Sequence, residues 1–184
     1  MKKYCLKTIC TFLPRGPWEK KGSTTGKYPI FDHGLKNNLY TDNYDFDDEN
    51  VLLDTNVNII YYQGKFSSKF YILRFKSNNP NVLTKYICYY LQQHKNLIYD
   101  KIKEKSIKYI TKNDLENIII PVPSLNDQQI IINKIDNINK QIDIKKQEIL
   151  KEINNFELEK EKVILELDNR DSFLSVSEYK TKFK

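Results

Sequence analysis

Residues 125–169 contain neither Gly nor Pro, and this uninterrupted stretch constrains the fold more than any other feature. It predicts one long helix, because Gly and Pro are the residues least tolerated inside helices. Apolar residues recur in it every seven positions, at Ile135, Ile142, Ile149, Phe156 and Val163. Three residues after each of these positions the residue is apolar only once, at Ile138. The stripe is therefore too thin for a strong parallel two-stranded zipper. We expect residues 125–168 to form a helical arm that packs on another helix over part of its length.

The start of this arm is marked by turn and capping residues. Pro121 and Pro123 precede it and are expected to act as a hinge that fixes the direction of the chain, since Pro cannot extend the helix backwards. Ser124 and Asp127 have the spacing of a capping box. An arm of this length would reach roughly 65 Å, and residues 169–184 are expected to be a polar tail. The residues expected to bury the stripe against a partner are Ile135, Ile138, Ile142, Ile149, Ile153, Phe156, Val163 and Leu167.

The first 124 residues show the mixed pattern of an α+β domain. Residues 51–75 are rich in Val, Ile, Tyr and Phe and predict two or three strands, with a hairpin turn at Gln63–Lys65. Residues 83–102 have apolar side chains at helical spacing. A last short strand is expected at Ile118–Ile120, and Thr111 with Asp114 predicts a helix cap just before it.

Charge is distributed unevenly between these two parts. The whole chain has a formal charge of +6, but residues 1–124 hold 19 Lys or Arg against 12 Asp or Glu, whereas residues 125–184 hold 11 against 12. Residues 55–112 alone hold 11 basic and two acidic side chains. A basic lobe followed by a balanced arm favours a polyanionic partner for the lobe and a protein partner for the arm. Part of the lysine excess can also reflect an AT-rich genome.

Other classes of protein are disfavoured by what the sequence lacks. It has no run of 18 apolar residues, which argues against a membrane span, and its first residues do not resemble a secretory signal. The three cysteines, Cys5, Cys10 and Cys88, form no C-x-x-C pair, so we expect free thiols, no structural metal and a cytoplasmic location.

One segment resembles a known family, the specificity subunits of type I restriction–modification systems. In "ITKNDLENIIIPVPSLNDQQIIINKI" the family's features are Thr-x-x-Asp-Leu, an apolar strand, Pro-x-Pro, and a helix start with Gln128 and helically spaced Ile. "GKYPIF" and "VLTKYICYYL" resemble two further family segments. This chain departs from the family in having Asp127 before the two Gln, and in lacking a Gly-x-x-Gly segment in its central strand.

The resemblance implies a compact target-recognition domain over residues 1–124, a spacer and dimerisation helix over 125–168, and no catalytic residue or cofactor. Full-length members carry two recognition domains and two helical regions, so this chain looks like a half-subunit. Two copies would pair through their long helices as an antiparallel coiled coil and read a bipartite, inverted-repeat site in double-stranded DNA. The homodimer would position a DNA methyltransferase and, in some systems, a restriction subunit.

Basic and amide-bearing loop residues are the candidate DNA contacts. Lys and Arg suit phosphates, Asn suits adenine edges and Arg suits guanine edges. The candidates are Arg15, Lys20, Lys21, Ser23, Thr24, Thr25, Lys27, Lys36, Asn37, Asn38, Tyr40, Lys65, Ser67, Lys69, Lys105, Lys108 and Tyr109. Each one could instead be an ordinary solvated loop residue.

Two alternatives of other classes stay open at this point. Glu178-Tyr179-Lys180 imitates the end of a metal-dependent nuclease site, although no acidic partner precedes it on an apolar strand. The chain could also be a helix-armed interaction protein with no role on DNA. His33, beside Asp32, is expected to be a polar turn residue rather than a catalytic one.

Overall fold

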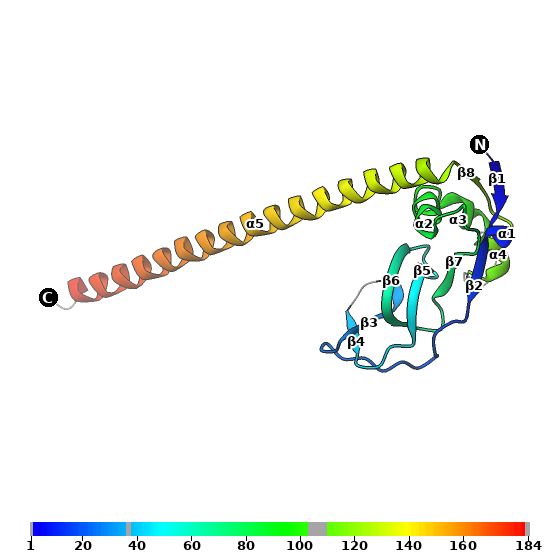
Figure 1. The fold of residues 1–184 in the computed structure, drawn as a ribbon. Coiled ribbons are helices and arrows are strands. Elements are labelled where there is room, and N and C mark those ends of the chain that lie inside the picture. The colour runs from blue at the N-terminus through cyan, green and yellow to red at the C-terminus, as the bar shows by residue number, and fades with distance from the viewer. Residues whose placement is uncertain (1, 36–37, 103–109, 183–184) are drawn as a thin grey trace. The chain divides into compact units, whose positions relative to one another are not determined.

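A computed structural model describes the backbone of residues 2–35, 38–102 and 110–182, and their side chains as far as residue 167. The chain divides into two compact units, Met1–Lys134 and Ile135–Lys184. We call the first unit the lobe. The helix α5 (Leu125–Lys182) contributes its first turns to the lobe and forms the second unit, which we call the arm (Figure 1). α5 begins at the predicted residue, but its backbone stays helical beyond the predicted end at residue 168.

The lobe mixes short strands and helices, so the predicted α+β class with a long C-terminal helix is confirmed. In chain order its elements are β1 (Lys2–Cys5), α1 (Leu6–Ile9), β2 (Cys10–Leu13), β3 (Tyr28–Phe31), the 3-10 turn η1 (His33–Leu35), β4 (Leu39–Thr41), β5 (Phe46–Leu53), β6 (Ile59–Ser68), β7 (Leu73–Ser77), α2 (Thr84–Gln93), α3 (Asn96–Ile102), α4 (Lys112–Glu116) and β8 (Ile119–Val122). No helix in the described part of the chain is apolar over enough residues to cross a membrane.

Two sheets organise the lobe. The larger has the strand order β2-β7-β5-β6-β3-β4, with β3 parallel to β6 and the other neighbours antiparallel. The smaller joins β1 to β8, with Lys2 opposite Val122 and Cys5 opposite Ile119. The beginning of the chain is therefore paired with the strand that leads directly into α5.

The central strands bury both faces of the larger sheet, because side chains alternate along a strand. Val51, Leu53 and Phe75 face a core that also holds the apolar residues of α2 and α3. Leu52 and Phe66, from the other face, belong to a second core. Figure 1 shows α2 and α3 together at one end of the lobe, and the connection from β2 to β3 at the other.

Both predicted helix caps are present. The Asp114 carboxylate accepts the Thr111 backbone N–H at 2.7 Å, and Ser124 Oγ accepts the Asp127 N–H at 3.2 Å. The single helix expected over residues 83–102 is instead two, α2 and α3, separated at His94. The break allows both helices to bury apolar residues in the same core.

The predicted hairpin turn at Gln63–Lys65 is wrong. These residues lie within β6, where Gly64 is opposite Asp48 of β5 and has a φ of 123°. The chain turns instead between Asp54 and Asn58, where the buried Asp54 carboxylate accepts the backbone N–H groups of Asn56 at 2.9 Å and Asn58 at 2.8 Å. A short carboxylate that binds nearby backbone N–H groups can replace Gly in a turn.

Candidate nucleic-acid interface

The predicted contact loop between β2 and β3, residues 14–27, is held to the lobe along its length. We call it the basic loop. The Pro14 carbonyl accepts a hydrogen bond from Arg74 Nη1 at 2.8 Å, and the Lys20 carbonyl accepts one from Lys69 Nζ at 2.6 Å. Ser23 and Tyr40 exchange two backbone hydrogen bonds, of 3.0 and 2.8 Å. The basic loop therefore presents its side chains from a fixed backbone.

Arg74 is the buried cation behind this loop. Its side chain is 3% exposed, its guanidinium carbon lies 3.3 Å from the centroid of the Phe46 ring, and Nη2 lies 3.3 Å from Asp48. Burial lowers the pKa of Arg74 to about 10, and the nearby Asp48 and Asp45 oppose that shift. At neutral pH Arg74 stays charged and joins the basic loop to the strands β5 and β7.

Two carboxylates of the acidic stretch that follows β4, Asp45 and Asp48, are paired with cations of the lobe. Lys20 Nζ lies 2.7 Å from Asp45, and Lys76 Nζ lies 3.2 Å from Asp48. Glu49 accepts a hydrogen bond from Thr84 Oγ1 at 2.9 Å. The two ion pairs reduce the repulsion that Asp45 and Asp48 would exert on a polyanion near the basic loop.

Most predicted contacts in the basic loop are accessible. Lys21, Ser23, Thr24, Thr25 and Lys27 are exposed, whereas Arg15 and Lys20 are half-buried. Burial lowers the pKa of Arg15. Tyr40 and Lys69 are half-buried beside the basic loop.

The segment Lys65–Lys69 differs from its prediction as an exposed turn, since residues 65–68 lie in β6. Lys65 is exposed and its ammonium lies 4.8 Å from the centroid of the Tyr44 ring; nearby Tyr44 is the main cause of its raised pKa. Ser67 is fully buried beside Ile30 of β3, so it cannot contact DNA from this position and is corrected to a core residue. The alternation of the strand places Ser67 on an inner face, which a turn assignment does not foresee.

Of the remaining predicted contacts, the structure describes one. Asn38 is exposed just before β4. Five candidates, Lys36, Asn37, Lys105, Lys108 and Tyr109, lie outside the described residues.

An exposed aromatic pair in the same region was not among the predicted contacts. Trp18 is 71% exposed and Phe70 is 41% exposed, and their ring centroids are 5.2 Å apart. Phe70 follows β6 in the chain, so only tertiary structure brings it to Trp18. The one signal available in the sequence was the Trp within a run of Lys, Gly and Pro.

The base of α5 is anchored in the lobe by Gln128, a residue of the family-like segment. Its side chain is fully buried. Gln128 Oε1 accepts the Leu83 N–H at 2.8 Å, and Nε2 donates to the carbonyls of Asn81 at 2.9 Å and Pro123 at 3.0 Å. Of the predicted hinge residues, Pro121 lies in β8 opposite Lys3, and its carbonyl accepts from Tyr86.

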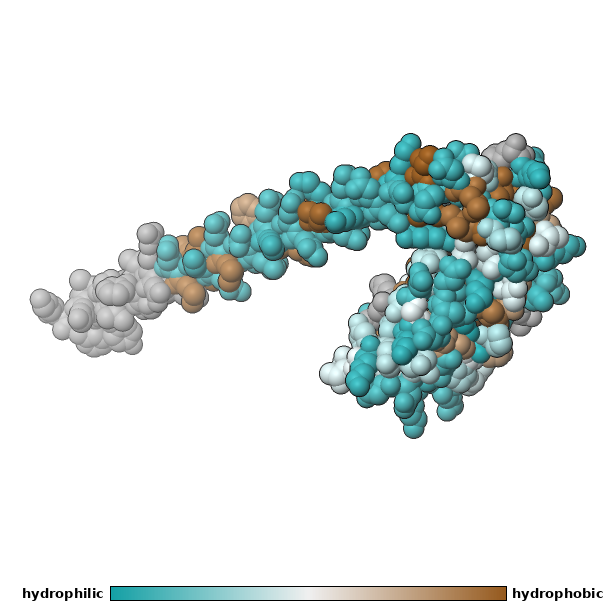
Figure 2. Space-filling model, in the orientation of Figure 1, coloured by the Kyte–Doolittle hydropathy of each residue, from teal (hydrophilic) through white to brown (hydrophobic). Residues whose placement is uncertain are grey.

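The predicted dimerisation stripe lies exposed along the arm. Ile138, Ile149 and Phe156 are 53%, 53% and 68% exposed, and Ile142, Ile153, Val163 and Leu167 are exposed as well, with Ile135 half-buried. Figure 2 shows apolar residues recurring among polar ones along this helix. Ile164, also exposed, lies on the same side of an ideal helix, whereas Ile144 lies opposite.

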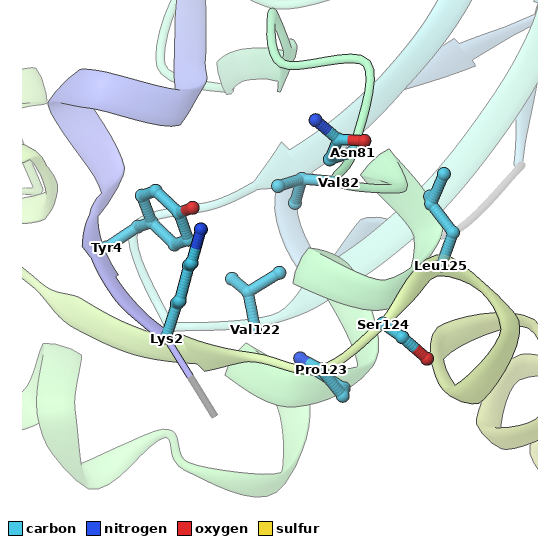
Figure 3. Close-up of a pocket in the computed structure, with 8 residues that line it drawn as sticks. All are labelled: Lys2, Tyr4, Asn81, Val82, Val122, Pro123, Ser124 and Leu125. Carbon is cyan, nitrogen blue, oxygen red and sulfur yellow. The ribbon is translucent and has the colours of Figure 1, made fainter.

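A pocket of about 560 Å³ lies next to the start of α5 (Figure 3). Lys2 and Tyr4 of β1 line one side, and Val82, Val122 and Leu125 line the others. None of the predicted DNA contacts lines it. The described residues also contain no group of three or more His, Cys, Asp or Glu side chains placed to hold a metal ion.

Comparison with known proteins identifies the family. The family model described as "Type I restriction modification DNA specificity domain" matches residues 1–155. The chain belongs to this family. The match covers the whole lobe and extends into the arm, so the resemblance found in the sequence is confirmed. The family is named for DNA specificity and not for catalysis, as predicted for a recognition subunit.

Solved structures of this family share the fold. The S subunit of a type I restriction–modification system from M. genitalium has a TM-score of 0.65 at 18% identity, over 77% of this chain and 40% of that one. The HsdS subunit from Thermoanaerobacter tengcongensis has a TM-score of 0.52 at 16% identity, over 77% of this chain and 38% of that one. A chain from a study of complex assembly and conformational transition of the type I R-M system has a TM-score of 0.57 at 17% identity, over 77% and 38%. The matched region spans about two fifths of these relatives.

Proposed function

We propose that this chain reads double-stranded DNA as half of a specificity subunit. Two copies pair through their arms, each lobe reads one half of a bipartite site, and the assembly positions a DNA methyltransferase. One observation carries this proposal. This member of the specificity family combines a basic loop that is tethered to the lobe with an exposed apolar stripe on the arm.

The basic loop has the properties of a surface that contacts phosphates and base edges. Its cations project from a backbone held by Arg74 and Lys69, so little conformational freedom would be lost on binding. Lys21 and Lys27 are exposed and suit phosphates, while Arg15 suits a guanine edge. The ion pair between Lys20 and Asp45 neutralises a carboxylate that would otherwise repel DNA.

The stripe on the arm favours a second copy in the antiparallel orientation. Lys160 lies near the middle of the stripe, between Phe156 and Val163. Parallel pairing in register would place Lys160 against its own copy and Glu152 close to Glu157 of the other chain, and like charges at these positions destabilise a coiled coil. Antiparallel pairing avoids both contacts.

The charges beside the stripe also select one register. On an ideal helix Lys145 and Glu159 lie along one edge of the stripe, and Lys146 and Glu157 lie along the other. Residues on the same edge meet in an antiparallel pair. A two-fold axis near residue 152 brings Lys145 to Glu159 and Lys146 to Glu157 of the other copy, while Ile149 packs between Ile153 and Phe156. The two copies of Glu152 meet at this axis, and the four Lys–Glu pairs around it offset that one like-charge contact.

The length of the paired helices suits a bipartite site. With a two-fold axis near residue 152, the Leu125 residues of the two copies would lie roughly 80 Å apart at 1.5 Å per residue. Successive turns of duplex DNA are about 34–36 Å apart. The two half-sites are therefore expected to lie a little more than two turns apart.

Selection of duplexes from a randomised library by the purified chain, at two salt concentrations, tests the proposal. Enrichment of an inverted repeat with a constant gap is the expected result, since a two-fold dimer reads a two-fold site. Salt-sensitive binding without enrichment would refute specific reading by the chain alone. A second selection with the methyltransferase encoded beside it would then test recruitment separately.

A further inference from the structure

Trp18 is an exposed aromatic side chain that the fold of the lobe does not use. It is the single tryptophan of the chain, and 71% of its side chain is exposed. Tryptophan is usually buried over most of its surface, since its ring offers one of the largest apolar areas of any side chain. Beside the exposed ring of Phe70, Trp18 therefore belongs to an apolar surface of the kind on which other molecules bind.

The exposure of Trp18 does not come from a loosely held segment. Gly16, two residues before it, is buried, and a Cβ there would overlap the carbonyl of Ser68. Two residues after it, the Lys20 carbonyl accepts a hydrogen bond from Lys69. The backbone on both sides of Trp18 is thus fixed to the end of β6, and the ring is presented in place.

Phe70 and Arg15 support the ring from behind. The Trp18 and Phe70 ring centroids are 5.2 Å apart with the planes tilted by 51°, and the Arg15 guanidinium carbon lies 5.2 Å from the centroid of the Phe70 ring. Arg15 Nη1 also donates a long hydrogen bond of 3.4 Å to the Phe70 carbonyl. The three side chains form a small platform, two rings and a cation, whose outermost member is Trp18.

The charges around this platform identify its partner. The basic loop holds Arg15, Lys20, Lys21 and Lys27 against one acidic residue, Glu19. Lys69 lies next to Phe70 in the chain, and the neighbouring carboxylate of Asp45 is paired with Lys20. Aromatic rings flanked by cations suit nucleobases flanked by phosphates, because bases stack on aromatic faces and phosphates bind Lys and Arg.

We propose that Trp18, supported by Phe70, inserts at a base step of the bound DNA and stacks on the base that it uncovers. Lys21 contacts a phosphate beside this step. Apolar side chains of DNA-binding proteins are known to unstack base steps in this way. This inference rests on the proposed DNA-binding function and adds to it a contact that depends on stacking instead of charge.

The single tryptophan makes the contact directly measurable. The full-length chain is titrated with a labelled, mixed-sequence duplex at low salt, while the anisotropy of the duplex and the emission of Trp18 are recorded together. We expect Trp18 emission to be quenched in parallel with binding, and its accessibility to acrylamide to fall. Binding by anisotropy with unchanged Trp18 emission would overturn the stacking contact alone. Absence of duplex binding at any salt concentration would overturn the proposed function itself.

Substitutions distinguish stacking from charge. Trp18→Ala is expected to weaken duplex binding roughly ten- to a hundredfold and to leave the salt dependence of binding unchanged, because the ring carries no charge. Lys21→Ala should instead reduce the salt dependence by about one counterion. Trp18→Phe should retain most of the affinity, since it keeps an aromatic face.

A matched control comes from another exposed aromatic residue. Tyr99 of α3 is 45% exposed and lies outside the basic loop, so Tyr99→Ala should bind DNA as the unsubstituted chain does. The urea midpoints of the Trp18 and Tyr99 variants show whether each lobe is folded. A folded Trp18→Ala variant that binds as tightly as the Tyr99→Ala variant would refute the contact.

Discussion

The lobe and the arm treat the same residue type in opposite ways. Ile87 of the lobe is fully buried, whereas Ile149 of the arm is 53% exposed. Isoleucine gains its stabilising free energy only when it is removed from water. The lobe obtains this gain within one copy of the chain, through its two cores. The arm leaves its stripe exposed in a single copy, so under the proposed pairing one chain contains a complete domain and half of an interface.

The largest effect is expected from a charge placed in the apolar stripe of the arm, which tests whether the stripe is buried by pairing. Ile149→Asp should abolish pairing of the arms, because the substituted carboxylates would be buried near the proposed two-fold axis. We expect a monomer by sedimentation at concentrations where the unsubstituted chain is dimeric, with the urea midpoint of the lobe unchanged. The matched control is Ile144→Asp, on the opposite side of the helix, which should remain dimeric. A dimeric Ile149→Asp variant would show that the arms do not pair through this stripe.

Gln128 tests where the lobe ends and the arm begins. Gln128→Ala leaves the Leu83 N–H and two carbonyls without their buried partner, which should cost about 1–3 kcal/mol of the free energy of unfolding. Urea unfolding followed by circular dichroism measures this loss. Gln129→Ala is the control, since Gln129 is exposed and its side-chain amide donates to Asn133 of the same helix. Equal stability of the two variants would mean that Gln128 does not anchor α5.

A smaller effect is expected from the charges beside the stripe. In the single chain Lys145 Nζ lies 2.7 Å from Glu148, and the hydrogen bond to Glu148 raises its pKa. The double variant Lys145→Glu, Lys146→Glu should weaken the dimer several-fold, since exposed charge pairs contribute little each. Adding Glu157→Lys and Glu159→Lys restores the pairing without changing the net charge. Failure of this fourfold variant to recover the dimer would reject the register.

No change is expected in the reactivity of the buried thiols of the lobe when the arm is altered. Burial raises the pKa of Cys10 to about 12 and raises that of Cys88 further above its usual range. Both thiols therefore stay protonated and unreactive between pH 7 and pH 9, because a raised pKa delays formation of the reactive thiolate. Their labelling by a disulfide reagent should be slow and identical in the unsubstituted chain and in Ile149→Asp. Faster labelling in the variant would show that the lobe depends on the arm.

Local sequence patterns predicted the start of the long helix and its cap correctly, whereas the helical backbone continues past the predicted end at residue 168. Tertiary contacts explain the other errors. Ser124 with Asp127 needs only neighbours in the chain, so the cap was predictable. The turn at Gln63–Lys65 was wrong because Gly64 serves inside a strand, while the Asp54 carboxylate makes the real turn. Ser67 was misplaced for the same reason, since burial depends on which strands flank β6.

The sequence by itself determined the α+β class, the family, the long helix and its apolar stripe. These follow from periodicity, capping residues and a contiguous motif, which are local properties of the chain. Only the tertiary structure decided which cations are accessible, how Arg74 and Lys69 hold the basic loop, and that Phe70 supports Trp18. These contacts join residues about fifty positions apart, and their geometry depends on strand order and register, which no local pattern encodes.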